Sequence, residues 1–204
     1  MPWTAERRAG VILASIAAIE GIWVVLNFAV NPAGFLRFLG FAVGRAGTPS
    51  GWVAALVVAL AFVAASLRLP SVRSDLLRPS WLKVLALEVA VVAGILEEVV
   101  FRKLLMDWLQ RENWGGAVQI IASGLAFGAA HAVWGIFGRS LRAASGAMVA
   151  TGLLGLALAV VYVIGGRSVA PCVVAHFAIN ALIEPGLVLA AARGEMGRAA
   201  AAIA

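Results

Sequence analysis

The chain has 204 residues, of which 63% are apolar and only 13% are charged, with a formal net charge of +6. A soluble domain is about 45–50% apolar and about 25% charged, so this composition excludes an ordinary soluble fold and favours a protein whose solvent is the lipid bilayer. The positive charge does not indicate nucleic-acid binding, because the arginines lie between apolar runs, where the positive-inside rule and anionic headgroups account for them.

Six apolar runs, each about as long as a bilayer-spanning helix, follow one another along the chain. They cover about residues 9–30, 52–67, 81–109, 116–137, 144–164 and 169–192, with a polar connector at 68–80. We therefore predict an all-α fold, a polytopic transmembrane helical bundle of about six helices. This length leaves no room for a separate soluble domain, so residues 1–204 are expected to form a single membrane domain.

The third run contains three ionisable residues, Glu97, Glu98 and Arg102. Each such group inside a membrane helix costs about 2.5–3.5 kcal/mol on insertion scales and usually faces the bundle interior. Glu98 and Arg102 are four residues apart and should pair on one helix face. Glu97 then remains as a possible general base. The alternative is a charge cluster that reaches out to the membrane interface, since Lys103 and Asp107 follow.

The fourth and sixth runs each carry one of the two histidines of the chain. Phe127 and His131 are four residues apart, and Gly124 and Gly128 form a G-x-x-x-G pair that allows close helix approach. In the last run His176 and Asn180 also share one face, and an Asn amide can donate to a developing oxyanion.

These polar residues lie at similar depth. The third, fourth and sixth runs have their centres near residues 95, 127 and 180, so four residues each fall within about 6 Å of the bilayer midplane: Glu97, His131, His176 and Asn180. We therefore predict a catalytic cavity among the third, fourth and last helices.

The residue pairs also match an ordered set of motifs. Glu97 to Arg102 fits E-E-x-x-x-R, Phe127 to His131 fits F-x-x-x-H, and His176 to Asn180 fits H-x-x-x-N. In this order on separate hydrophobic helices, they resemble the CAAX-protease/bacteriocin-processing (CPBP, or Abi) family of intramembrane endopeptidases, which includes the type II CAAX prenyl endopeptidases. The resemblance covers residues 81–189, expected to be the protease core, and leaves residues 1–80 as two extra N-terminal transmembrane helices.

The resemblance implies a role for each of these residues. Glu97 and His131 would activate a water, and His176 and Asn180 would stabilise the oxyanion. The supporting residues would be Glu98, Arg102 and Phe127. Glu97, His131 and His176 would also suffice as ligands of a catalytic zinc, and the family has been labelled a metalloprotease. We favour no metal, because Asn180 suits an oxyanion donor better than a zinc ligand.

We therefore expect an intramembrane endopeptidase that hydrolyses a peptide bond of a membrane-associated peptide or protein C-terminus. The alternative is a non-proteolytic immunity or adaptor protein on the same scaffold. A proton-coupled transporter fits less well, because the chain is small and lacks paired broken helices. The Ala/Gly/Val/Arg-rich composition is typical of a bacterial protein of the cell (inner) membrane, for which a leader or signalling peptide is a better substrate than a prenylated CAAX protein.

Overall fold

Helices make up the secondary structure of residues 4–137 and 140–193, which are the part of the chain that the computed structural model describes, and no strand occurs in these ranges. The predicted all-α fold is confirmed. Within these ranges five helices are long and apolar enough to cross a membrane: α1 (Ala5–Val30), α3 (Pro49–Ser66), the run Gly116–Phe137, α9 (Leu141–Ile164) and α10 (Ala170–Arg193). The run Gly116–Phe137 consists of α7 (Gly116–Ala130), a 3₁₀ turn η2 (His131–Val133) and α8 (Trp134–Phe137).

The sixth expected span, residues 81–109, has a more complex structure than one regular helix. It consists of α5 (Trp81–Glu98), a π-helical stretch η1 (Val99–Met106) and α6 (Asp107–Arg111). Within α5 lie four ionisable side chains, Lys83, Glu88, Glu97 and Glu98. Glu97 and Glu98 are what α5 contributes to the site described below.

Two short helices were not predicted from the sequence. α2 (Pro32–Phe38) follows α1, and α4 (Pro70–Asp75) lies in the expected polar connector. Both begin with proline, whose fixed φ suits the first helical turn and whose missing N–H costs nothing there. The side chain of Asn31 caps α2 by accepting a hydrogen bond from the Gly34 N–H at 2.9 Å.

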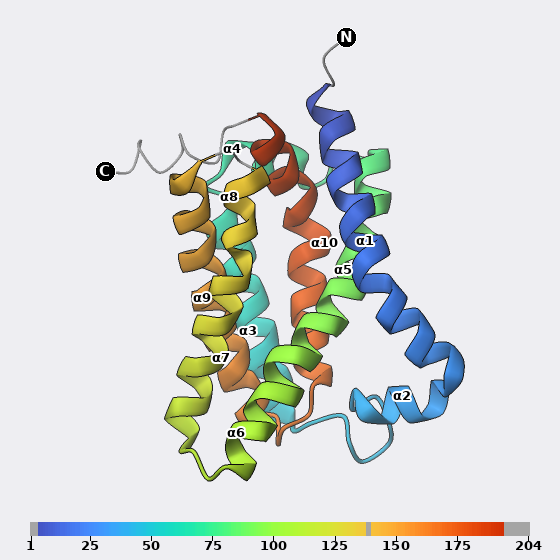
Figure 1. Ribbon diagram of the computed structural model, residues 1–204, viewed down its shortest axis with the longest axis vertical. Coiled ribbons are helices and arrows are strands. Elements are labelled where there is room, and N and C mark those ends of the chain that lie inside the picture. Colours follow the sequence, from blue (N-terminus) through green and yellow to red (C-terminus); the bar gives the residue numbers. More distant parts are fainter. Residues whose placement is uncertain (1–3, 138–139, 194–204) are drawn as a thin grey trace.

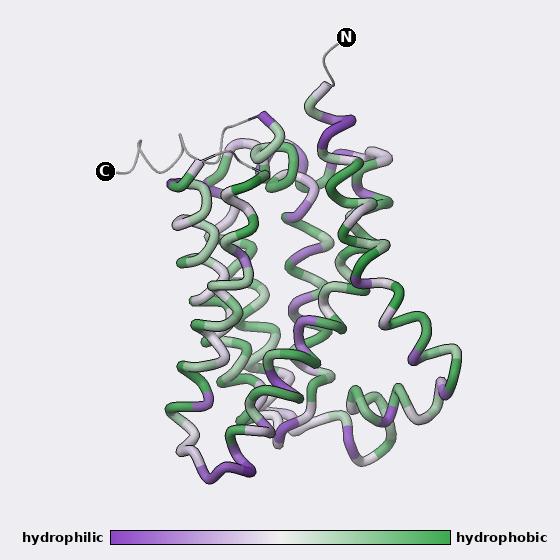
Figure 2. Tube along the Cα trace, viewed as in Figure 1, coloured by the Kyte–Doolittle hydropathy of each residue, from purple (hydrophilic) through white to green (hydrophobic). Residues whose placement is uncertain are grey.

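The last helix, α10, is the most buried of the five membrane-crossing candidates and packs against α5, α3, α4 and α1 (Figure 1). The outer helices α1 and α3 instead expose large apolar side chains, among them Ile19, Ile22, Val53 and Leu60. An apolar exterior of this extent suits contact with lipid. Figure 2 shows hydrophilic stretches in the interior, at the C-terminal end of α5 and in the middle of α10.

Glycines allow α7 and α9 to approach each other closely. A Cβ on Gly128 would lie 2.6 Å from the backbone oxygen of Met148, and a Cβ on Gly155 would lie 2.9 Å from the Cβ of Phe127. Both separations are shorter than van der Waals contact allows, so neither position tolerates a larger residue without moving the helices apart. The close approach expected from the Gly124 and Gly128 pair is confirmed.

Substituting Gly155 with Ala is therefore expected to destabilise the protein by about 1–3 kcal/mol through overpacking. Gly146, on the same helix, is a matched control, since nothing lies within 4 Å of a Cβ built there. Gly146→Ala should leave stability unchanged or raise it by up to about 1 kcal/mol, because Ala is the better helix former. Thermal unfolding in detergent measures both variants, and equal melting temperatures would argue against the close α7–α9 contact.

Candidate active site

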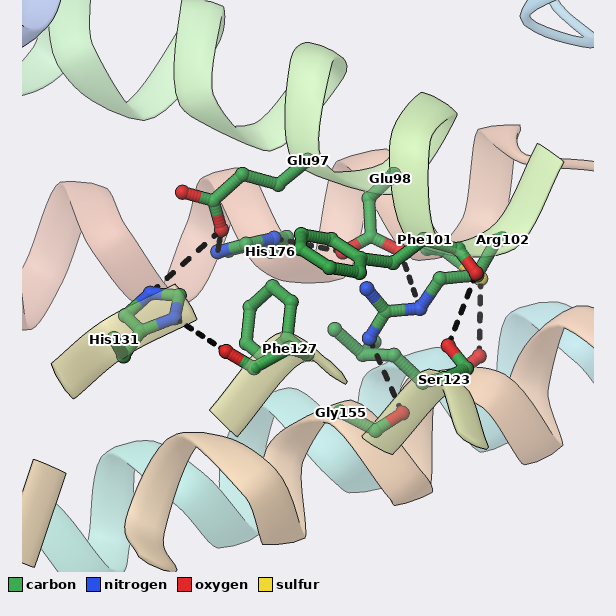
Figure 3. A network of polar contacts seen from close by, with 11 residues as sticks. Glu97, Glu98, Phe101, Arg102, Ser123, Phe127, His131, Gly155 and His176 are labelled. Carbon is green, nitrogen blue, oxygen red and sulfur yellow. Dashed lines mark hydrogen bonds and ion pairs between the residues drawn. The ribbon is translucent and has the colours of Figure 1, made fainter. Parts of the chain in front are cut away.

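Three helices bring Glu97, His131 and His176 together (Figure 3). The Nε2 atom of His131 and the Nε2 atom of His176 each lie 3.8 Å from the same oxygen, Oε2 of Glu97. This oxygen is buried and has no hydrogen-bond partner among the described residues. The side chains of Glu97 and His131 keep 19% and 17% of their surface exposed, so the site is accessible from outside the protein core.

The orientation of His131 follows from the end of α7. The His131 N–H turns back to the Gly128 oxygen in a 3₁₀ pattern, which leaves the Phe127 oxygen without its usual helical donor. The Nδ1 atom of His131 lies 2.8 Å from that oxygen. A carbonyl can only accept, so Nδ1 carries the proton and donates it. The Nε2 atom of a neutral His131 is therefore an acceptor, and it faces Glu97.

His176 is held in a similar way by a carboxylate. Its Nδ1 atom lies 2.8 Å from Oε1 of Glu98, and the histidine is 2% exposed. An ionised carboxylate accepts only, so Nδ1 again donates and Nε2 is directed towards Glu97. A ring nitrogen that donates to a carboxylate or a carbonyl fixes the orientation of the other nitrogen. Both histidines are thus fixed with Nε2 pointing to one place.

Glu98 and Arg102 form a fully buried ion pair, with Oε2 of Glu98 3.1 Å from Nε of Arg102. This pairing, predicted from the i,i+4 spacing, is confirmed. Arg102 also donates to the Gly155 oxygen at 3.2 Å and stacks over the Phe127 ring at 4.7 Å. The alternative of a cluster that reaches the membrane interface is wrong for Glu98 and Arg102, because neither side chain has any exposed surface.

The π-helical stretch was not predicted and lies immediately after the two glutamates. In a π-helix the backbone hydrogen bonds span five residues rather than four, so different carbonyl oxygens accept them. Such segments are frequent at functional sites. The Phe101 oxygen accepts a hydrogen bond from the buried Ser123 hydroxyl of α7 at 3.0 Å. The Phe101 ring packs edge-on against Phe127, with centroids 5.2 Å apart. These contacts fix α7 against the helix that carries Glu97.

A protein-family model described as type II CAAX prenyl endopeptidase Rce1-like matches residues 79–182. This is just over half of the 204 residues, and it includes every residue of the network described above. The chain belongs to this Rce1-like family. No curated protein and no solved structure matches the chain. The family and the apolar helices together indicate a membrane protein with a protease-type site.

Asn180 is the one expected catalytic residue of this Rce1-like site that the structure does not bring into the network. It lies one turn after His176 on α10 and is half-buried. Within the described residues no hydrogen bond or ion pair involves its side chain. Its predicted role as an oxyanion donor therefore depends on its place beside His176 and stays a prediction.

Two further carboxylates lie near the Rce1-like site and were not assigned a role from the sequence. Glu20 on α1 and Glu184 on α10 each interact electrostatically with Glu97. One carboxylate oxygen of each is buried without a hydrogen-bond partner among the described residues. The i+8 spacing of Glu184 from His176 was the only sequence signal for this position, and Glu20 had none, because α1 carries no motif.

Whether a metal suits this Rce1-like site depends on how the donor atoms are placed. Among the described residues, no group of three or more His, Cys, Asp or Glu side chains is close enough to hold a metal ion. The candidate set Glu97, His131 and His176 has the right chemistry, since two imidazole nitrogens face one carboxylate oxygen. Its 3.8 Å separations nevertheless exceed those between ligands of one zinc ion, about 3.3 Å for tetrahedral bonds of about 2.0–2.1 Å. The arrangement as it stands fits a metal poorly.

Proposed function

We propose that the protein is an intramembrane endopeptidase that hydrolyses a peptide bond of a membrane-associated peptide or protein C-terminus, with a water activated by Glu97 and His131. Membership of the Rce1-like family supports a protease of this general kind over the non-proteolytic adaptor alternative. The expected location in a bacterial cell membrane, and a leader or signalling peptide as substrate, belong to the same proposal.

The observation that carries the proposal is the convergence of two histidine nitrogens on one glutamate oxygen. Separations of 3.8 Å are too long for direct hydrogen bonds, and a small adjustment of these side chains would let one water molecule bridge them. A water at this place would donate one hydrogen to Oε2 of Glu97 and the other to Nε2 of His131. Glu97 and His131 would then orient the water, and Glu97 would be in place to accept its proton, before the substrate binds.

In the proposed reaction, Glu97 accepts a proton from the water while the water oxygen attacks the carbonyl carbon of the peptide bond. The electrons of the C=O π bond move to the carbonyl oxygen, which becomes an oxyanion. Glu97 then transfers its proton to the peptide nitrogen, the oxyanion re-forms the C=O bond, and the C–N bond breaks with its electron pair left on nitrogen. The products are an amine and a carboxylic acid, so atoms and charges balance without a further reactant.

The oxyanion would be stabilised by His176 and Asn180. The buried cluster contains the carboxylates of Glu97 and Glu98 and the guanidinium of Arg102, so its net charge is negative by one. A second proton on His176 would balance this charge. Protonated His176 donates from Nδ1 to Glu98 and from Nε2 to the oxyanion. The Asn180 amide, one turn further along α10, would supply a second donor. Removing one such donor typically costs about 10²–10³-fold in rate.

The test is hydrolysis of a fluorogenic peptide library by detergent-purified protein, wild type beside His131→Ala. We expect turnover by the wild type and a loss of at least about 100-fold in the variant, with the same size-exclusion profile. Equal turnover in both would show that the site is elsewhere. If neither protein cleaves any peptide, including known leader peptides in proteoliposomes, the adaptor alternative becomes the better explanation.

A chelator distinguishes the proposed metal-free chemistry from zinc. Glu97, His131 and His176 act here without a metal, so EDTA and phenanthroline should leave the turnover of the wild-type protein unchanged. Loss of turnover that zinc restores would instead assign these three residues as metal ligands.

A further inference from the structure

A second polar site lies at one end of the bundle, away from the catalytic residues. An open pocket of about 800 Å³ is bordered there by α2, the loop between α2 and α3, the helices η1 and α6 with the turn after α6, and the loop between α9 and α10. We call it the basic pocket, because five of its lining side chains are cationic and one is a carboxylate. These six are Arg37, Arg45, Lys103, Asp107, Arg111 and Arg167.

The single carboxylate is already occupied by partners within the protein. Asp107 accepts from Arg167 at 2.7 and 2.9 Å and from the Tyr162 hydroxyl at 2.9 Å. Its other oxygen lies 3.5 Å from Nζ of Lys103. Arg167 is further fixed by a hydrogen bond to Gln119 at 3.0 Å. One wall of the basic pocket is therefore rigid, and its negative charge is neutralised.

The other three cations have no such partner. Arg37, Arg45 and Arg111 come from three different segments, and no ion pair involves any of them within residues 4–137 and 140–193. Like charges around one cavity repel each other, and a bound anion removes that repulsion. Arginine forks match the oxygens of a phosphate group, since two parallel N–H donors meet two acceptors.

The surroundings of the basic pocket are apolar and aromatic. Phe38 lines it at 39% exposure, and Phe41 and Val43, in the loop that supplies Arg45, are also exposed. Trp108 on α6 and Trp114 in the loop after it each expose about half of their surface. Exposed tryptophans beside cations at the end of a helical bundle are typical of the level of lipid headgroups. At the level of the lipid headgroups, the anion that carries both phosphate oxygens and apolar chains is a phospholipid.

We propose that the basic pocket binds the phosphate of an anionic phospholipid headgroup, with Arg37, Arg45 and Arg111 as its ligands. Because Arg37 and Arg45 precede residue 79 and Arg111 follows it, the bound headgroup connects the α2–α3 segment to the region that matches the Rce1-like family. The proposal is independent of peptide hydrolysis, and binding alone tests it.

Native mass spectrometry of the full chain in detergent, titrated with phosphatidylglycerol or phosphatidylcholine, gives an apparent Kd for each lipid. We expect phosphatidylglycerol to bind at least about tenfold more tightly than phosphatidylcholine. The triple variant Arg37→Gln, Arg45→Gln, Arg111→Gln should lose this preference, with a loss on the order of 100-fold at about fivefold per arginine. Should the triple variant not purify, single substitutions at Arg45 and Arg111 should each show the fivefold loss.

A matched control removes three exposed arginines from the opposite end of the bundle, near α4: Arg68, Arg73 and Arg78 (Figure 1). Replacing them with Gln changes the net charge equally and should leave the preference for phosphatidylglycerol intact. Equal affinity for both lipids, or equal losses in the two triple variants, overturns the proposal. Full competition by millimolar inorganic phosphate overturns the lipid assignment in favour of a free phosphate anion.

Discussion

Replacing Glu97 with Gln is expected to lower peptide turnover by about 10²–10⁴-fold without disturbing the fold. Gln keeps the shape of the side chain but cannot accept a proton from water. Its amide can still contact both histidines, and its position is partly exposed, so little stability should be lost. The measurement is the initial rate of hydrolysis at saturating peptide, with circular dichroism and size exclusion as checks on folding.

Glu88 provides the control for this substitution. It lies on the same helix, α5, but its side chain is exposed and takes part in no hydrogen bond or ion pair of the described structure. Glu88→Gln removes the same charge and should leave turnover unchanged. A rate for Glu97→Gln within about threefold of the Glu88→Gln rate would show that Glu97 is not the base.

The choice of Glu97 over Glu98 as the base also follows from their contacts. Glu98 is fully buried, with one oxygen hydrogen-bonded to His176 and the other in an ion pair with Arg102. A carboxylate held on both sides orients its partners and is poorly placed to exchange protons with a substrate. Glu97 has a free oxygen and an exposed edge. We therefore propose different functions for the adjacent glutamates, which share His176 but otherwise face different partners, His131 for Glu97 and Arg102 for Glu98.

Much of this site could be predicted from the sequence, because polar residues are rare inside membrane helices and usually mark a functional site. The pairs Glu98–Arg102 and His176–Asn180 were visible as i,i+4 spacings inside apolar runs. Similar depth then placed Glu97, His131 and His176 at one level, as the structure has them. In a soluble protein the same spacings would carry far less information, since polar residues there are common.

Other features could not be predicted, because they depend on contacts between helices. The direct bond from His176 to Glu98 requires the rotation of α10 against α5, which no spacing within one helix specifies. The break of α7 at His131 and the π turn after Glu98 replace regular backbone bonds with bonds to the His131 ring and to Ser123. The helix propensity of the residues does not specify such replacements of one hydrogen bond by another. Both segments were therefore predicted to be continuous helix.

The ion pair between Glu98 and Arg102 carries the largest expected effect on stability. Arg102→Met should cost about 3–5 kcal/mol, because it leaves Glu98 buried without its cation. The variant also loses the hydrogen bond from the Arg102 guanidinium to the Gly155 oxygen and the contact of that guanidinium with the Phe127 ring. Unfolding of the variant in a titration with SDS measures the cost.

The neighbouring Lys103 is the natural control, since it pairs with Asp107 at 3.5 Å on the partly exposed side of the same segment. Lys103→Met should cost no more than about 1 kcal/mol. If Arg102→Met is no less stable than Lys103→Met, the buried pair does not hold these helices together.

The double substitution Glu98→Gln, Arg102→Met separates the cost of an unpaired charge from the value of the pair. Replacing both members of a buried ion pair with neutral groups is often neutral for stability, so the double variant should recover most of what Arg102→Met alone loses. The introduced amide oxygen can still accept from Nδ1 of His176, but a neutral amide cannot balance a proton on that ring. The double variant should therefore fold and remain slow in peptide hydrolysis, because Nδ1 of His176 then meets a neutral amide in place of a carboxylate, although Glu97 keeps the net charge of the cluster unchanged. A fully active double variant would mean that the pair serves folding alone.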